Sequence, residues 1–271
     1  MSANLMSLAR SGGKFLKLFG DRKMMKTIPT ARDYVQDGLV AMWDGIENAG
    51  WRTHDPNATA WVDLTGNHSS VATTSALLSW GVNYLQFASE ANMESRPTAL
   101  EQKYGHGNGP MTIEQTGVFA DDMDSRGFAI MQFRSSGDQS AGVAAGSIVA
   151  LPVTSRDNRY GTGKNAYFPW PSGLYNFGNV RGGDFIFSAT TDGNTWGIYE
   201  KGALLSKDMT LGTWSWYNSM ARFLWASNSA GSKCSGKVYC IRIYSRALTA
   251  DEIAANYAID KARFNLTTST I

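Results

Sequence analysis

The sequence is poor in charge, in cysteine and in long apolar runs. Charged residues make up 18% of its 271 positions and two positions are cysteine, while 43% are hydrophobic and 12% aromatic. So many aromatic residues with so little charge exclude disorder for most of the chain. Two cysteines in this length exclude a disulfide scaffold. The chain is long enough for one large domain, or two small ones, with a hydrophobic core.

The longest apolar run also excludes a membrane span. It covers residues 141–153, is interrupted by glycine and closes at Pro152, which is typical of a buried strand. The basic N-terminus lacks the apolar segment that a signal peptide needs, because residues such as Gly12 and Lys14 interrupt every candidate. We therefore expect the protein in the cytoplasm of the producing cell, or in a virion assembled there.

The two cysteines lie in one strand-like run. Cys234 and Cys240 are six positions apart, and this spacing in an extended strand is too long for a disulfide between them. We expect reduced thiols, with one or both buried.

Positive charge is concentrated at the N-terminus. Residues 1–33 hold seven basic and two acidic residues, while the remainder holds 18 basic and 21 acidic residues. The sequence therefore divides into a basic arm over 1–34 and a slightly acidic body. Because the body lacks a clustered basic face, it is not expected to bind nucleic acid.

Apolar residues in the arm occur at helical spacing but in pieces too short for stable isolated helices. We expect the arm to become ordered against a protein assembly or a second copy, with folding along its own body as the alternative. The residues predicted to anchor it are Arg10, Lys14, Phe15, Lys17, Phe19, Arg22 and Lys23.

From Val35 onward, short apolar segments alternate with turn residues such as DLTGN and EKG. Residues 190–205 form a predicted hairpin that turns at Lys201 and Gly202. Many short strands at regular spacing predict an all-β sandwich or barrel. The predicted strands cover 38–43, 58–64, 83–87, 111–119, 127–133, 146–151, 184–190, 195–200, 221–226 and 236–244.

One helix is predicted after the last strand. Thr249 and Glu252 have the spacing of a capping box. Ile253 and Tyr257 fall on one face of a helix that runs to about Lys261. We expect this short helix to pack on the sandwich edge.

Two blocks resemble the laminin G-like jelly-roll domains of the concanavalin A-like lectin/glucanase superfamily. GLVAMWDG (38–45), followed by DLTGN (63–67), is similar to that family's opening pattern. CIRIYSRAL (240–248), after the hairpin, is similar to its closing strand. The resemblance implies an antiparallel jelly-roll sandwich over 35–265 and leaves 266–271 as a tail. It implies fold much more than function.

The polar residues in these blocks have structural interpretations. Asp63 and Asn67 are expected to hold their own tight turn, and Arg246 is expected to bond loop carbonyls or a carboxylate.

Hydrolysis is not expected. Glucanases of this superfamily place paired carboxylates on one strand, and the nearest pair here is Asp122 and Asp124, in a predicted turn. The three histidines, His54, His68 and His106, lack the spacing of a transition-metal site. No cofactor is expected.

Calcium is left open by the resemblance, because such domains bind it through carboxylate and carbonyl oxygens. The alternative is that these carboxylates cap turns. The candidate ligands are Asp44, Asp63 and Asp184.

Aromatic residues beside Asn, Gly and Pro are the strongest indication of a binding surface. Pyranose rings pack their C–H faces on aromatic rings, but the same residues also suit a protein interface or a core at the ends of the sandwich. The predicted contact residues, taken to lie in loops, are Trp51, His54, Tyr167, Trp170, Trp214, Trp216 and Tyr217.

The sequence thus predicts a non-enzymatic binding or assembly module. The arm and the sandwich favour a structural component of a virion, such as a bacteriophage capsid decoration or fibre protein. The aromatic loops favour a carbohydrate-binding, lectin-like module of a bacterium or phage. A glycosidase is the third alternative.

Overall fold

The computed structural model describes thirteen stretches of the chain. They are residues 28–67, 70–73, 76–87, 93–94, 110–119, 128–133, 148–154, 165–170, 173–179, 184–192, 195–210, 221–226 and 235–266. Within them the chain is mostly β, every pairing between strands is antiparallel, and one α-helix lies near the C-terminus. The predicted all-β class is confirmed.

The larger sheet has eight strands in the described part of the chain. They are β1 (Leu39–Asp44), β4 (Leu78–Trp80), β5 (Leu85–Phe87), β7 (Met111–Phe119), β12 (Asp184–Thr191), β13 (Thr195–Glu200), β14 (Ala203–Thr210) and β16 (Gly236–Tyr244). Their order is β14-β13-β12-β7-β16-β5-β4, and β1 also pairs with β16.

The second sheet has six described strands in the order β11-β10-β9-β8-β15-β6. They are β6 (Met93–Glu94), β8 (Phe128–Phe133), β9 (Ile148–Thr154), β10 (Asn165–Trp170), β11 (Gly173–Asn179) and β15 (Ala221–Ala226). A separate ribbon pairs β2 (Ala60–Trp61) with β3 (Val71–Ala72).

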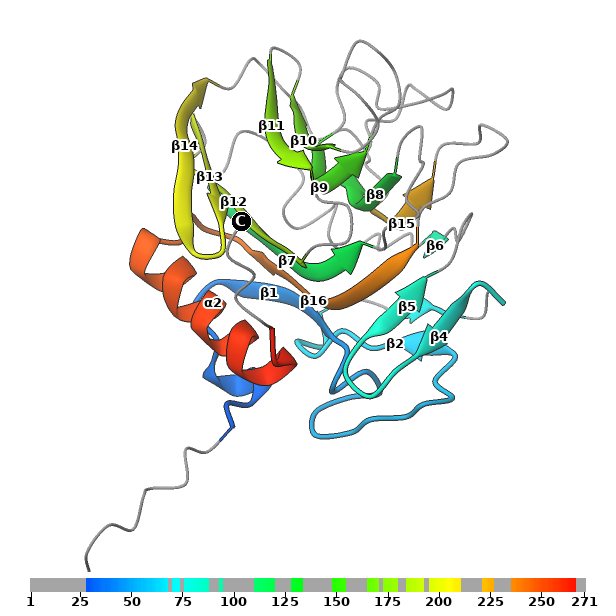
Figure 1. Cartoon of the computed structure of the whole chain (residues 1–271). Helices are drawn as coiled ribbons and strands as arrows, with labels where there is room; N and C mark the ends of the chain where they lie inside the picture. Colours follow the sequence, from blue (N-terminus) through cyan, green and yellow to red (C-terminus); the bar gives the residue numbers. More distant parts are fainter. Residues whose placement is uncertain are drawn as a thin grey trace, which may run out of the picture.

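The elements form layers (Figure 1). The second sheet lies over one face of the larger sheet, and α2 (Ala250–Phe264) lies across the other face, with the short 3-10 helix η2 (Ala31–Asp33) at its end. No helix among the described residues is long and apolar enough to cross a membrane.

The central strand of the larger sheet is β16. On one side it pairs with β7, and on the other it pairs first with β5 and then with β1. Its sequence is rich in β-branched and aromatic residues, and every residue except Lys237 is buried. Residues 238, 240, 242 and 244 alternate with 239, 241 and 243, a pattern that on its own predicts one apolar core face. The structure buries both faces, because α2 covers the side that carries Arg242 and Tyr244.

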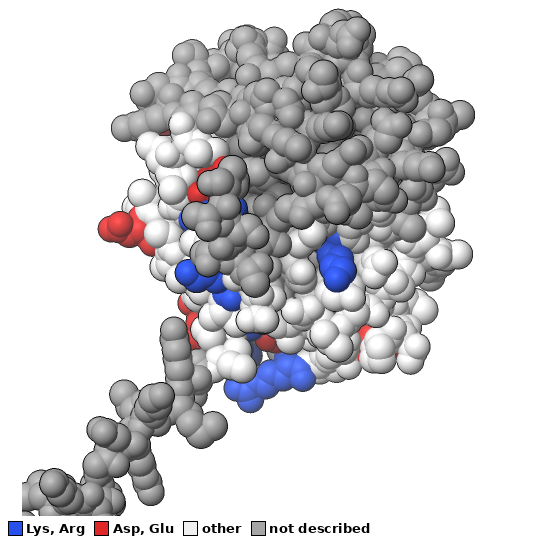
Figure 2. All heavy atoms as spheres, viewed as in Figure 1, with Lys and Arg blue, Asp and Glu red and all other residues white. Residues whose placement is uncertain are grey.

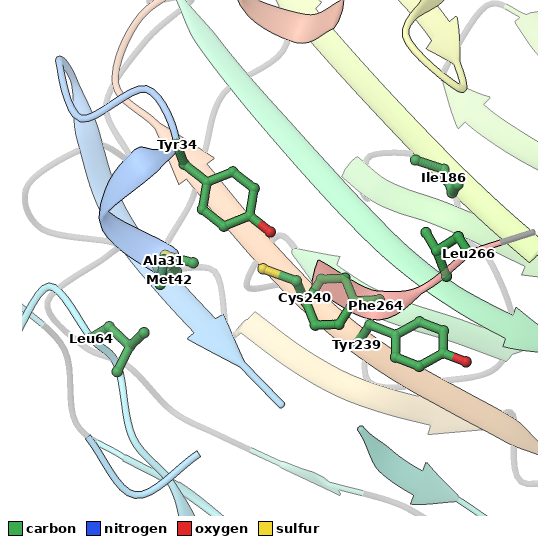
Figure 3. Close-up of a cluster of buried hydrophobic side chains, with 9 residues drawn as sticks. All are labelled: Ala31, Tyr34, Met42, Leu64, Ile186, Tyr239, Cys240, Phe264 and Leu266. Atoms are coloured by element: carbon green, nitrogen blue, oxygen red, sulfur yellow. The ribbon is translucent and has the colours of Figure 1, made fainter. Parts of the chain in front are cut away.

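A buried hydrophobic cluster joins β1, β12 and β16 to α2 and η2 (Figure 3). Within it the ring of Tyr239 stacks on Phe264, with centroids 5.2 Å apart. Ala31 and Tyr34, from the predicted arm, and Leu266, from the predicted tail, belong to this same cluster. Burial of each large side chain of this kind contributes about 1.5–3 kcal/mol before ordering costs.

Local signals located several elements correctly. The strands β7, β13, β15 and β16 have the predicted bounds, and Thr249 and Glu252 form the predicted capping box of α2. The hairpin between β13 and β14 turns at Lys201 and Gly202, with φ of +49° and +76°. Positive φ at both positions suits the twist of a two-residue hairpin turn.

Two predictions about local structure were wrong. The strand expected over 58–64 shortens to Ala60–Trp61, because the Asp63 carboxylate turns the chain there. Tyr167 and Trp170, expected in a loop, lie in strand β10. The described residues of β9 pair with β10 only at Ala166 and Tyr167. Pro169 lies beyond that ladder, where its missing N–H is tolerated.

Candidate functional site

A buried ionic cluster fixes α2 to the larger sheet. Arg242 of β16 donates from both Nη atoms to the Asp260 carboxylate of α2, at 2.7 and 2.9 Å. Its Nε donates to Glu114 of β7 at 2.9 Å, and all three side chains are at most 2% exposed. Burial raises the pKa of the Glu114 carboxyl, and the Arg242 guanidinium opposes that rise. The geometry therefore locks one orientation of α2 on strands β7 and β16.

The same cluster holds the chain segment that leads into β1. The Tyr34 hydroxyl donates to Asp260 at 2.6 Å, and the Arg242 guanidinium carbon lies 4.0 Å from the Tyr34 ring centroid. The backbone N–H of Val35 donates to the Asn256 side chain at 3.0 Å. The end of the predicted arm is therefore fixed on its own body by α2.

A second buried ion pair fixes the loop that follows β1. Arg263 of α2 donates to the Asp44 carboxylate at 2.8 Å and to the Pro29 carbonyl at 3.4 Å. Asp44 also accepts the backbone N–H groups of Ile46 and Glu47. Burial raises the pKa of Asp44, while Arg263 and these N–H groups oppose the rise. The C-terminal end of α2 thus binds both the segment that leads into η2 and the loop.

Glu47 joins this loop to η2. Its carboxylate accepts the Arg52 N–H at 2.9 Å and the Ala31 N–H at 3.4 Å. The loop closes with a tight turn in which the Thr53 N–H donates to the Gly50 carbonyl at 2.9 Å. Arg52, in the third position of that turn, has φ +58°. This left-handed conformation costs a residue other than Gly, Asn or Asp about 1–2 kcal/mol.

These contacts position what we call the Trp51 surface: Arg32 and Trp51, which are in contact, together with Arg52 and His54, the exposed residues that follow Trp51 in its loop. The Arg32 guanidinium carbon lies 4.9 Å from the Trp51 ring centroid. Trp51 is half-buried and packs against the cluster of Figure 3, whereas the other three residues are exposed. Figure 2 shows basic side chains exposed at this end of the body, over η2 and the C-terminal end of α2.

The Trp51 surface is rich in unused hydrogen-bond donors. Within the described stretches, no side-chain hydrogen bond or ion pair involves the Arg32 and Arg52 guanidinium groups, the Trp51 indole N–H or the His54 imidazole. The neighbouring carboxylates have partners: Asp33 accepts the Thr30 N–H and hydroxyl, and Asp55 accepts the Asn57 N–H. The ring of Trp51 and the guanidinium of Arg32, which lies against it, can therefore be offered to one ligand, and Arg52 and His54 add donors in the same loop.

The structure brings together only part of the predicted contact residues. Trp51 and His54 share this surface, while Tyr167 and Trp170 lie in the second sheet. Arg32 could not be recognised as a site residue from the sequence, because nothing local links it to Trp51. Several predicted residues lie outside the described stretches: Trp214, Trp216, Tyr217, Asp122, Asp124 and the arm residues Arg10, Lys14, Phe15, Lys17, Phe19, Arg22 and Lys23.

The candidate calcium ligands have other partners. Asp44 binds Arg263, and Asp63 accepts the N–H groups of Met42, Thr65 and Asn67. The predicted turn-holding role of Asp63 is confirmed. Across the part of the chain that the structure describes, no group of three or more His, Cys, Asp or Glu side chains is placed to hold a metal ion. The side chain of Asp184 lies outside that part.

The predicted role of Arg246 is also confirmed. Its Nε donates to the Asp37 carbonyl at 3.1 Å, and its two Nη atoms donate to Glu252 at 2.9 and 2.6 Å. Cys240 is a buried free thiol, as expected, and Cys234 lies outside the described residues.

No protein-family model matches the chain, and no curated protein matches it by sequence. Solved structures do match. Trypanosoma rangeli sialidase, in complex with 2,3-difluorosialic acid, superposes with a TM-score of 0.58 over 86% of this chain at 15% identity. The ligand-binding domain of botulinum neurotoxin serotype D, in complex with N-acetylneuraminic acid, gives 0.54 over 82% at 11% identity. The likeness is one of fold.

The matches cover only part of those proteins. The chain spans 34% of the sialidase chain and 51% of the neurotoxin chain. The laminin G-like resemblance therefore still rests on the two sequence blocks. The predicted virion role gains no support from these matches and stays a prediction.

Proposed function

We propose that this chain is a carbohydrate-binding module with a jelly-roll sandwich, and that it binds sugar without cleaving it. The observation that carries the proposal is the Trp51 surface, where a half-buried ring lies among unused donors. An aromatic ring offers an apolar face to the C–H groups of a pyranose, and guanidinium and indole N–H groups donate to hydroxyl oxygens.

The comparisons support the proposal by analogy. The sialidase and the neurotoxin domain were both solved with sialic acid or a fluorinated derivative of it bound. Their likeness to this chain concerns fold, so it favours a sugar ligand without locating the site. The jelly-roll topology is supported by the two layers of antiparallel strands and by the family-like blocks at 38–67 and 240–248.

The absence of cleavage is proposed from the sequence, which lacks alternating carboxylates on one strand. An assay against a panel of polysaccharides tests it, with Asp122→Ala and Asp124→Ala as the informative variants. Turnover that either substitution abolishes would make the protein a glycosidase.

Assembly through the arm stays a separate prediction. Residues 28–35, at the end of that arm and the start of the body, pack on the same chain through Pro29, Ala31, Tyr34 and Val35. This agrees with the alternative that the arm folds along its own body, at least for these residues.

A glycan array probed with the full chain tests sugar binding, followed by calorimetric titration of the best glycan. We expect Trp51→Ala to weaken binding by about tenfold or more, as truncation of a central ring typically does. The matched control is Tyr84→Ala, because Tyr84 also packs on the cluster of Figure 3 and lies under a cation, Lys237, at 4.3 Å.

The outcomes separate the possibilities. Wild-type protein that binds no glycan would refute the proposed function. Binding that survives Trp51→Ala unchanged would place the sugar elsewhere on the molecule. Equal losses from Trp51→Ala and Tyr84→Ala would indicate a general effect on folding.

A further inference from the structure

We propose that the Trp51 surface selects acidic sugars, and that Arg32 sets this specificity by moving from the Trp51 ring to the sugar carboxylate. The inference rests on the proposed function and names the substrate class of that same site. It is carried by the stacking of an unpaired, exposed guanidinium on the ring that a sugar would need.

The free state places Arg32 where the sugar must go. Trp51 packs on the buried cluster, and Arg32 is exposed, so the guanidinium lies on the solvent side of the ring. A pyranose can pack on this side only after Arg32 has left it. A neutral sugar displaces Arg32 and gives it no new partner. An acidic sugar displaces it and offers a carboxylate.

The exchange favours the carboxylate. A cation over an exposed ring is held weakly, whereas a guanidinium and a carboxylate form two parallel charge-assisted hydrogen bonds. No carboxylate among the described residues forms an ion pair with Arg32, and the nearby Asp33 and Asp55 accept hydrogen bonds from Thr30 and Asn57. The incoming acid therefore meets an unsatisfied donor.

The loop that carries Trp51 supplies a second cation. Arg52 follows Trp51 directly, and its backbone N–H is held by Glu47 at 2.9 Å. Its guanidinium is exposed and has no ion-pair partner within the described stretches. Glu47 itself is buried, and its carboxylate accepts hydrogen bonds from Arg52, Ala31 and Arg263.

Only the Arg32 side chain has to move. Its backbone lies in η2, which is capped by Thr30 and followed directly by Tyr34, held by Asp260. Rotation of one exposed side chain takes picoseconds to nanoseconds, so the exchange requires no opening of the fold.

The test compares one sialylated glycan with its desialylated counterpart, 3′-sialyllactose and lactose, on the full chain. Wild-type protein should bind sialyllactose more tightly. Arg32→Ala should weaken sialyllactose binding by about tenfold, which is the loss of affinity expected when the hydrogen bonds between one guanidinium and one carboxylate are removed. The same substitution should strengthen lactose binding, because it uncovers the ring. Lys237→Ala is the matched control, since it removes the cation over Tyr84, and should change neither affinity.

Two further measurements support the assignment. Arg32→Lys keeps the charge but loses the planar fork, so its sialyllactose affinity should lie between those of wild type and Arg32→Ala. Raising the salt concentration should weaken sialyllactose binding to wild type and have less effect on Arg32→Ala.

Opposite effects of Arg32→Ala on the two sugars would support the inference. Equal losses for both sugars, no change for either, or a wild-type preference for lactose would overturn it and leave the proposed sugar binding intact. Failure of the wild type to bind any glycan on the array would instead refute the proposed function.

Discussion

Asp260 accepts both Nη groups of Arg242, at 2.7 and 2.9 Å, so the last helix and the central strand are joined by a bidentate ion pair that is nearly inaccessible to water. Asp260 also accepts the hydroxyls of Tyr34 and Thr116. One carboxylate thus ties α2, β7, β16 and the segment before β1 together. The Trp51 surface depends on this arrangement, because the same segment carries Arg32.

Asp260→Asn should lower the free energy of unfolding by about 3–5 kcal/mol, since it leaves Arg242 with an incomplete counter-charge in a buried site. Urea unfolding measures the change. Asp251→Asn is the control: Asp251 is exposed in the first turn of the same helix, so its loss should cost about 0.5 kcal/mol. Similar effects of the two substitutions would show that the buried pair contributes little.

The Glu252 carboxylate should give a pH-dependent contribution to stability. Its hydrogen bonds to Arg246 and then to Thr249 lower its pKa to about 2, against 4.5 for an ordinary glutamate. Because the folded pKa is depressed, the stabilisation is complete above pH 4.5 and is lost as the pH falls towards 2. Glu252→Gln should therefore lower the free energy of unfolding by about 1 kcal/mol at pH 7. The loss is small because Arg246 and Glu252 are partly exposed and water screens their interaction.

The difference between wild type and Glu252→Gln should shrink as the pH falls. Denaturant melts at intervals from pH 7 to pH 2 measure it. A difference that stays constant over this range would assign the effect to the shape of the capping box and not to the charge of Glu252.

The helices, turns and strands that were predicted correctly from the sequence are determined by residues close together in the chain. The capping box of α2 joins Thr249 to Glu252, and the hairpin turn needs only Lys201 and Gly202. The strand β16 follows from a run rich in β-branched and aromatic residues. Each signal lies within a few positions, so it could be recognised without knowing the fold.

The candidate site could not be predicted in the same way. Arg32 and Trp51 meet because Arg263 and Glu47 hold η2 against the loop after β1. These contacts join segments far apart in sequence. Pro169 made β10 resemble a loop, and its pairing with β9 and β11, which no local pattern reveals, shows that it is a strand. Trp51 and His54 were found because they are neighbours in one loop.

Cys240 should be inert towards alkylating reagents in the folded protein. Burial raises the pKa of its thiol far above the ordinary value, although the nearby Arg242 opposes the shift. The reactive thiolate is therefore scarce and inaccessible. Iodoacetamide labelling of a Cys234→Ser variant, followed by mass spectrometry, should show modification of Cys240 in denaturant only. Rapid labelling of the native variant would contradict the buried position.

Arg52→Asn should stabilise the fold while it weakens acidic-sugar binding. Arg52 has φ +58° in the turn closed by Thr53 and Gly50, and asparagine adopts this conformation more readily than arginine. We expect the free energy of unfolding to rise by about 1 kcal/mol, measured by urea unfolding. Affinity for 3′-sialyllactose should fall, because one of the two unpaired cations is lost.

Arg32→Asn is the control. It removes the other cation, and Arg32 is not among the residues with positive φ. This substitution should therefore weaken binding without the gain in stability. A loss of stability in Arg52→Asn would show that the arginine side chain contributes contacts that outweigh the strain of its backbone.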